Sequence, residues 1–192
     1  RSFATWAGGP DKRTEPVLLP GVHGTGFAVN GKALPTQETA DGTYVLASVP
    51  QIGSTVITAC DAQEAACAFA FDAANHTIET PFYKAVWNTK GHLASLLYNG
   101  REVLSGEANV LEVYEDKSMA HDAWDIDIYY TQKKEYAVLA KHPEVIENGA
   151  LRFTIRLTYT YNKSTFTQDV TFYAHSPRID FATTADWHED HR

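Results

Sequence analysis

The residues best suited to chemistry gather in residues 114–130, whose sequence is YEDKSMAHDAWDIDIYY. Carboxylates accept hydrogen bonds from neighbouring hydroxyl groups, and an aromatic face covers the apolar C–H face of a pyranose ring. This mixture of acids and rings therefore indicates a carbohydrate-facing segment. The structural alternative is that Trp124 and Tyr129 fill the gap between two sheets, while Asp122 and Asp125 cap turns through their own backbone.

The acids of this segment do not form a metal-binding motif. Asp122, Asp125 and Asp127 lack the spacing, the central glycine and the terminal glutamate of a calcium loop. The HEDH sequence at residues 188–191 separates its histidines by three positions, not by the four of His-Glu-x-x-His, and such positions face opposite sides of a strand. We expect no metal ligand in this chain and assign these residues to solvent or interdomain hydrogen bonds.

Nucleophile and dinucleotide-binding signatures are also missing from the sequence. No Gly-x-Ser-x-Gly stretch occurs, and the glycines within residues 21–26 follow a proline and precede no helical pattern. These glycines are therefore turn residues, and His23 between them is a surface loop side chain. We predict no catalytic residue in this chain.

The composition indicates a globular protein made of strands. Of the 192 residues, 44% are hydrophobic, 21% are charged and 12% are aromatic, and aromatic, Thr and Val side chains favour pleated sheets. A net charge of −8 without clustered Lys and Arg argues against a nucleic-acid partner. No apolar run is long enough to span a bilayer, so we expect no membrane partner. Cys60 and Cys67 are expected to be free thiols in a reducing compartment, with a hairpin disulfide as the alternative.

Turn signals divide the chain into two phases. Between residues 16 and 60, short apolar runs are separated by turns such as Asn30-Gly31 and Asp41-Gly42, which supply the positive φ of two-residue hairpins. After residue 75 the expected strands are longer, Asn99-Gly100 is expected to form another turn, and two alternating runs form a long hairpin. These longer strands are expected at residues 82–87, 92–98, 151–161 and 165–173. The change in strand length predicts two domains, residues 1–75 and 76–192, both built from antiparallel sheets.

Four blocks carry a family likeness in their order and spacing. They are IETPFY (78–83) leading to GHLASL (91–96), GREVL (100–104), NVLEVYED (109–116) running into DAWDID (122–127), and SPRIDF (176–181) with DWHE (186–189). In these blocks the chain resembles the glycoside hydrolase family 38 α-mannosidases, in the branch that includes cytosolic and bacterial enzymes. The resemblance covers residues 76–192, and residues 49–53 are similar to the closing strand of the family's small sandwich.

The resemblance implies one part of a modular enzyme. Residues 1–75 would be a small immunoglobulin-like sandwich, and residues 76–192 would be the N-terminal part of a large antiparallel super-sandwich of the galactose-mutarotase type. In the family, two His and two Asp of an α/β catalytic domain hold zinc, and one of those Asp residues is the nucleophile of a retaining mechanism. None of those motifs occurs here. The chain would then be an inactive fragment without a cofactor of its own, from a zinc-dependent cytoplasmic parent that hydrolyses terminal α-D-mannosyl residues of glycans.

Such a fragment would pack on its own catalytic domain, support it and lend residues to the rim of the active site. From composition and position, Asp122 and Asp125 are candidate acceptors for sugar hydroxyls or for donors of the catalytic domain. Trp124 is the candidate wall of the sugar pocket.

Two other interpretations stay open. The chain could be a stand-alone carbohydrate-binding β-sandwich module, although its ends, Arg1-Ser2 and His191-Arg192, resemble cuts within a longer chain. A mutarotase-like enzyme would need a histidine and an acid poised over a sugar ring oxygen. The histidines available for that role are His121, His142 and His175.

Overall fold

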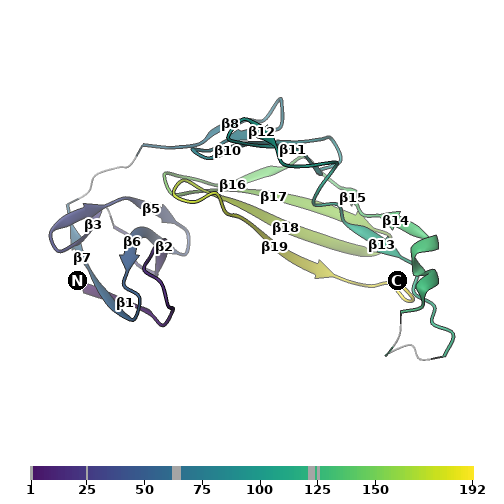
Figure 1. The fold of residues 1–192 in the computed structure, drawn as a ribbon, viewed down its shortest axis with the longest axis horizontal. Helices are drawn as coiled ribbons and strands as arrows, with labels where there is room; N and C mark the ends of the chain where they lie inside the picture. Colours follow the sequence, from purple (N-terminus) through teal and green to yellow (C-terminus); the bar gives the residue numbers. More distant parts are fainter. Residues whose placement is uncertain (1, 25, 62–65, 121–123, 125) are drawn as a thin grey trace. The chain divides into compact units, whose positions relative to one another are not determined.

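The computed structural model describes residues 2–24, 26–61, 66–120, 124 and 126–192. Their regular structure is almost entirely antiparallel strand, which confirms the predicted all-β fold (Figure 1). The helical segment among these residues is the 3-10 helix η1 (Ile128–Gln132), and no described helix has the length and apolar character needed to cross a membrane.

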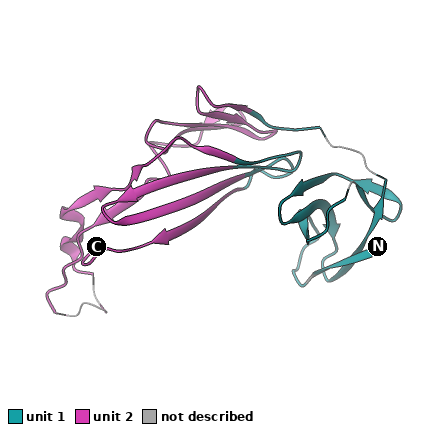
Figure 2. Cartoon of the chain, turned by 180° about the vertical axis from the view of Figure 1, so that it is seen from behind, with its two compact units in different colours: residues 1–70, 146–154, 172–178 teal, residues 71–145, 155–171, 179–192 magenta. Residues whose placement is uncertain are grey.

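The chain divides into two compact units (Figure 2). Unit 1 contains Arg1–Ala70, Ile146–Thr154 and Phe172–Arg178, and unit 2 contains Phe71–Val145, Ile155–Thr171 and Ile179–Arg192. The predicted division into domains 1–75 and 76–192 stays a prediction.

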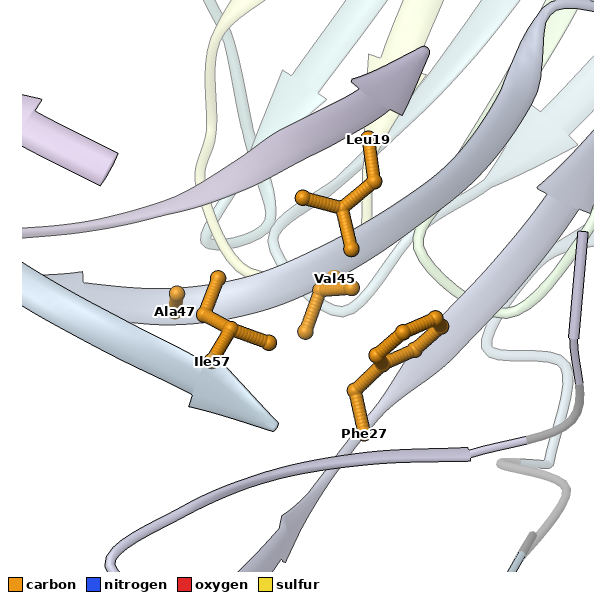
Figure 3. Close-up of a cluster of buried hydrophobic side chains, with 5 residues drawn as sticks. All are labelled: Leu19, Phe27, Val45, Ala47 and Ile57. Carbon is orange, nitrogen blue, oxygen red and sulfur yellow. The ribbon is translucent and has the colours of Figure 1, made fainter. Parts of the chain in front are cut away.

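Unit 1 contains a small two-sheet sandwich. One sheet has the strand order β1-β7-β3-β4 and the other has the order β2-β6-β5. Both sheets contribute to one buried cluster, because Leu19 comes from β2, Phe27 from β3, Val45 and Ala47 from β6, and Ile57 from β7 (Figure 3). The strands are β1 (Ser2–Ala7), β2 (Arg13–Pro20), β3 (Gly26–Val29), β4 (Lys32–Leu34), β5 (Thr36–Thr39), β6 (Gly42–Val49) and β7 (Gly53–Cys60).

A buried amide also holds unit 1 together. Gln37 on β5 is 7% exposed, and its Oε1 accepts hydrogen bonds from the backbone N–H groups of Leu151 (2.8 Å) and Arg152 (2.7 Å). Its Nε2 donates to Glu147 Oε1 at 2.7 Å. All the hydrogen-bonding atoms of this amide are therefore used, as a buried polar side chain requires.

Cys60 and Cys67 are free thiols, as the sequence predicts. Cys60 ends β7, and the Sγ of Cys67 lies 3.7 Å from the carbonyl oxygen of Gly149. The ring of Phe69 packs 5.9 Å from the ring of Phe153. Cys67 and Phe69 therefore contact the 146–154 part of unit 1 through their side chains.

The predicted Asn-Gly turns are confirmed at two places. Asn30 and Gly31 have φ values of 51° and 77° between β3 and β4. Asn99 and Gly100 have φ values of 50° and 75° between β11 (Leu93–Tyr98) and β12 (Arg101–Glu102). Positive φ at both central residues matches the turn twist to the twist of the flanking strands.

Three sheets account for the remaining strands. Their orders are β12-β11-β10-β9-β8, β13-β14 and β15-β17-β18-β19, with β16 also paired to β17. The strands are β8 (Ala70–Asp72), β9 (Thr77–Glu79), β10 (Tyr83–Trp87), β11 (Leu93–Tyr98), β12 (Arg101–Glu102), β13 (Glu112–Tyr114), β14 (Lys134–Tyr136), β15 (Val138–Leu139), β16 (Glu144–Asn148), β17 (Arg152–Tyr161), β18 (Ser164–Tyr173) and β19 (Ile179–Asp186).

The long hairpin predicted over residues 151–173 is confirmed as β17 and β18, which run side by side (Figure 1). Asn162, with φ of 47°, lies in its tight turn. The side chains of Ile155, Leu157 and Tyr159 alternate with less buried ones and are at most 1% exposed. Period-two alternation therefore places one face of β17 in the core of unit 2.

Candidate functional site

The segment rich in acids and rings lies between two paired strands of unit 2. β13 and β14 are antiparallel, with Glu112 opposite Tyr136 and Tyr114 opposite Lys134. Residues 115–133, called the 115–133 loop below, leave this strand pair and return to it, and η1 lies in their second half. The strand pair therefore fixes both ends of the loop.

An ion cluster closes the base of the loop. The Glu115 carboxylate accepts a hydrogen bond from Lys117 at 2.8 Å, contacts the Lys133 ammonium, and lies 3.6 Å from the Arg192 guanidinium. The backbone N–H of Glu115 also donates to the carbonyl oxygen of Lys133 at 3.2 Å. The bonds from Lys117 and Lys133 lower the pKa of Glu115 from 4.5 to about 2. This carboxylate is therefore ionised at neutral pH and joins the two ends of the loop.

Five large apolar side chains of this loop are exposed. Trp124 is 88% exposed, Met119 is 85% exposed and Ile128 is 79% exposed, and Ile126 and Tyr129 are also mainly exposed. We call these five residues the loop face. Scattered single apolar residues are normal on a protein surface, whereas a contiguous patch of large ones marks an interaction site.

The predicted site residues are only partly described. Asp122 and Asp125 lie outside the described residues, and so does His121. Trp124 is exposed, as is Tyr129 at 60%, so the idea that these two rings fill a gap between sheets is wrong. The sugar-binding roles of Asp122, Trp124 and Asp125 stay predictions.

The HEDH sequence serves the β17–β18 hairpin through its glutamate. Glu189 accepts hydrogen bonds from the backbone N–H of Lys163 at 2.8 Å and from the Ser164 hydroxyl at 2.9 Å. The Nε2 of His188 lies 2.9 Å from a carboxylate oxygen of Asp186 on the surface. Both bonds to Glu189 lie within unit 2, so the predicted solvent or interdomain bonding is wrong for Glu189.

A histidine and an acid that sequence reasoning missed meet in unit 2. His92 follows the β10–β11 turn and is 5% exposed, and its Nδ1 lies 2.7 Å from Oε2 of Glu107. Asn88 donates to the other oxygen, Glu107 Oε1, at 2.9 Å. The hydrogen bond from His92 is the main cause that lowers the pKa of Glu107. No local spacing could have shown this pair, because fifteen positions separate the two residues.

These two residues line a cavity of about 520 Å³. Of the histidines named in the mutarotase-like interpretation, His142 and His175 do not line it, and His121 lies outside the described residues. The lining residues are Thr89, Lys90, His92, Glu107, Val110, Glu112, Tyr136, Ala137, Val138 and Leu139. A buried histidine that holds an ionised carboxylate beside a ring is an arrangement suited to binding hydroxyl groups.

Comparison with known proteins gives one family. The family model described as the glycosyl hydrolases family 38 C-terminal domain matches residues 78–192, which is more than half of the chain. The curated protein named alpha-mannosidase G, from Dictyostelium discoideum, is 28% identical over 125 residues. That match covers 60% of this chain and 11% of the length of the relative.

A solved structure has a similar fold. It is the crystal structure of a protein in the glycosyl hydrolase family 38 from Enterococcus faecalis, with a TM-score of 0.63 and 11% sequence identity. The match covers 96% of this chain and 31% of that chain. The present chain therefore spans less than a third of either relative.

Proposed function

This chain belongs to glycosyl hydrolase family 38 through the C-terminal domain matched by residues 78–192, and on that premise we propose that it is the non-catalytic β portion of an α-mannosidase. The parent would hydrolyse terminal α-D-mannosyl residues of glycans by a retaining mechanism. The named relative supports this substrate, since it is called an alpha-mannosidase. Both relatives also extend well beyond the region that this chain matches, which leaves room for a catalytic domain.

One observation carries the proposal, namely the loop face. Its apolar side chains are exposed although the loop is closed at its base by Glu115, Lys117 and Lys133. Large apolar side chains exposed above a base held by ion pairs are best explained by a surface that covers them. We assign the covering surface to the catalytic domain of the same parent, so that the loop face supports that domain and Asp122, Trp124 and Asp125 contribute to its active-site rim.

Zinc belongs, in this proposal, to the remainder of the parent. Among the residues with described positions, no three His, Cys, Asp or Glu side chains come close enough to hold a metal ion. These residues do not fit a zinc site, and no step through zinc is assigned to them. We also place the parent in the cytoplasm, where the two free thiols would stay reduced.

The test compares two equally exposed apolar residues in the full-length parent. Ile128 on the loop face is 79% exposed, and Ile52, between β6 and β7, is 80% exposed. Ile128→Asp should lower hydrolysis of a chromogenic α-mannoside about tenfold, because a charge buried in an apolar interface costs roughly 1.4 kcal/mol or more. Ile52→Asp should leave the rate within about twofold, since a surface change of this kind has a small effect.

Two results would contradict the proposal. The first is equal activity of the Ile128→Asp and Ile52→Asp parents, which would mean that nothing covers the loop face. The second is α-mannoside hydrolysis by this chain alone, which would place the chemistry within the chain itself.

A second candidate function, a stand-alone carbohydrate-binding module, has its own support in the cavity beside Tyr136. It differs from the first candidate in what it requires of the loop face. A stand-alone module has no catalytic domain to cover, so Ile128→Asp and Ile52→Asp would then bind glycan equally well.

A further inference from the structure

The cavity of unit 2 is built by three separate parts of the chain. The β10–β11 turn supplies Lys90 and His92, the segment before and into β13 supplies Glu107 and Glu112, and β14 with β15 supplies Tyr136 through Leu139. Its volume of about 520 Å³ lies within the range of roughly 300–1,000 Å³ that is typical of small-molecule sites. The cavity is therefore large enough for a small ligand.

The first acceptor in this cavity is held firmly. Glu107 receives one hydrogen bond on each oxygen, at 2.7 Å from His92 and at 2.9 Å from Asn88. An ionised carboxylate offers about four acceptor positions, so these two bonds leave capacity for a ligand. His92 is buried and cannot turn freely, which fixes the carboxylate relative to the cavity.

The second acceptor, the Glu112 carboxylate, lies beside the Tyr136 ring. Glu112 and Tyr136 are directly opposite in the β13–β14 register, so their side chains share one face of the strand pair. Lys134 donates to Oε1 of Glu112 at 2.8 Å, and the Tyr114 hydroxyl contacts the other oxygen of Glu112. The Lys134 ammonium also lies 5.6 Å from the centre of the Tyr136 ring. The acid and the ring are thus positioned by the same lysine.

The charges and walls of the cavity favour a neutral ligand. Two lysines, Lys90 and Lys134, lie close to the two carboxylates, at 3.9 Å and 2.8 Å, so neither an anion nor a cation finds a site of strongly opposite charge. Of the remaining lining residues, Thr89 carries a hydroxyl group. The others, Val110, Ala137, Val138 and Leu139, are apolar.

We propose that this cavity binds one neutral pyranose unit of a glycan. Hydroxyl groups of the sugar donate to Glu107 and Glu112, the Lys90 ammonium donates to a sugar oxygen, and the C–H face of the ring packs on Tyr136. This binding needs only the residues of the present chain. It does not rest on the activity proposed for the parent, and mannose enters only as the first sugar to test.

The experiment is a titration of this chain with methyl α-D-mannopyranoside, followed by NMR. We expect the amide signals of Lys90, His92 and Tyr136 to shift at millimolar sugar, and cyclohexanol at the same concentrations to leave them unchanged. Glu107→Gln should weaken binding about tenfold, because a charge-assisted hydrogen bond is roughly twice as strong as a neutral one. Glu79→Gln is the matched control, since Glu79 is an exposed carboxylate paired with Lys84, and it should stay within about twofold of the wild-type chain.

Two ring variants separate binding from folding. Tyr136→Ala should weaken binding about tenfold, whereas Tyr136→Phe, which keeps the ring, should keep the affinity of the wild-type chain. Equal responses to the sugar and to cyclohexanol, or no response to either, would overturn the proposal. Because the titration involves no hydrolysis, its failure would leave the proposed function of the parent untouched, and an inactive parent would leave this inference untouched.

Discussion

The β17–β18 hairpin and the 115–133 loop are both rich in aromatic and branched side chains, and they place them in opposite environments. Leu157 and Tyr159 on β17 are 0% exposed, whereas Trp124 and Ile128 in the loop are 88% and 79% exposed. The hairpin residues alternate with period two in strands that are paired along their length. The described residues of the loop contain the 3-10 helix η1 and form no strand of a sheet. Apolar content alone therefore does not say whether a segment forms core, because a side chain is buried only where another layer packs on its face.

The difference in burial also gives the hairpin and the loop different roles, the first in stability and the second in recognition. A fully buried Leu or Val side chain stabilises the folded state by about 1.5–3 kcal/mol relative to an exposed one. The hairpin side chains make this contribution within the chain itself. The loop face can make it only when another surface covers it, which is why we assign the loop to recognition.

The largest expected effect contrasts one residue from each region. Leu157→Ala should lower the free energy of unfolding by about 2–5 kcal/mol, because it removes buried methyl groups and leaves a cavity. Trp124→Ala should change the free energy of unfolding by no more than about 0.5 kcal/mol, although it removes the larger side chain. Urea unfolding of the two variants measures both values. A loss for Trp124→Ala as large as that for Leu157→Ala would show that the loop face stabilises this chain, and the comparison would fail.

A second, smaller effect on stability is expected at two glycines that have similar backbone conformations but different surroundings. Gly91 and Gly100 have φ of 81° and 75°, so a side chain is strained at both. An added Cβ at Gly91 would lie 2.8 Å from the Tyr159 hydroxyl and 3.0 Å from the nearest carbon of Leu139, whereas at Gly100 nothing lies within 4 Å.

Gly91→Ala should therefore cost about 2–4 kcal/mol of unfolding free energy, from backbone strain together with overpacking. Gly100→Ala should cost only about 1 kcal/mol, from the backbone alone. The measurement is thermal or urea unfolding of both variants side by side. Equal losses would mean that the Tyr159 side chain moves aside at no cost and that the core around it is loosely packed.

The hairpin was predictable from sequence because its information is local. Alternation over residues 151–161 and 165–173 and the Asn-Gly pairs at residues 30–31 and 99–100 each specify a geometry without reference to distant residues. The loop was recognised as unusual for its acids and rings, but composition could not decide between a buried plug and an exposed face. That outcome depends on whether another surface lies over Trp124, which no local pattern encodes.

The cavity was missed for a related reason. His92 and Glu107 are brought together by the pairing of β10 with β11 and by the bridge between Leu93 and Ala108. His92 lies in the GHLASL block, which carries a family likeness but no catalytic or ligand-binding signature, and Glu107 lies in none of the four blocks. Sites assembled from several strands require the register of the sheets, and the sequence alone gives the strands more readily than their register.

The smallest expected effect concerns the base of the loop and follows from the pKa of Glu115. This pKa lies at about 2 in the folded chain against an ordinary value of 4.5, so the ionised group contributes stability above pH 4.5 and loses it as the pH falls through about 2. The bonds to Lys117 and Lys133 should therefore persist at pH 4 and weaken only below about pH 3. A carboxyl-carbon NMR titration measures the midpoint of Glu115 ionisation, and the amide signal of Glu115 reports its hydrogen bond to Lys133.

In Glu115→Gln this acid transition should be missing, while the signals of Ile155 and Leu157 on β17 stay unchanged, because these side chains are buried in the core of unit 2. A midpoint near 4.5 in the wild-type chain would instead mean that the ion cluster does not close the loop in solution, and the loop face would lose the fixed base on which its role as a docking surface depends.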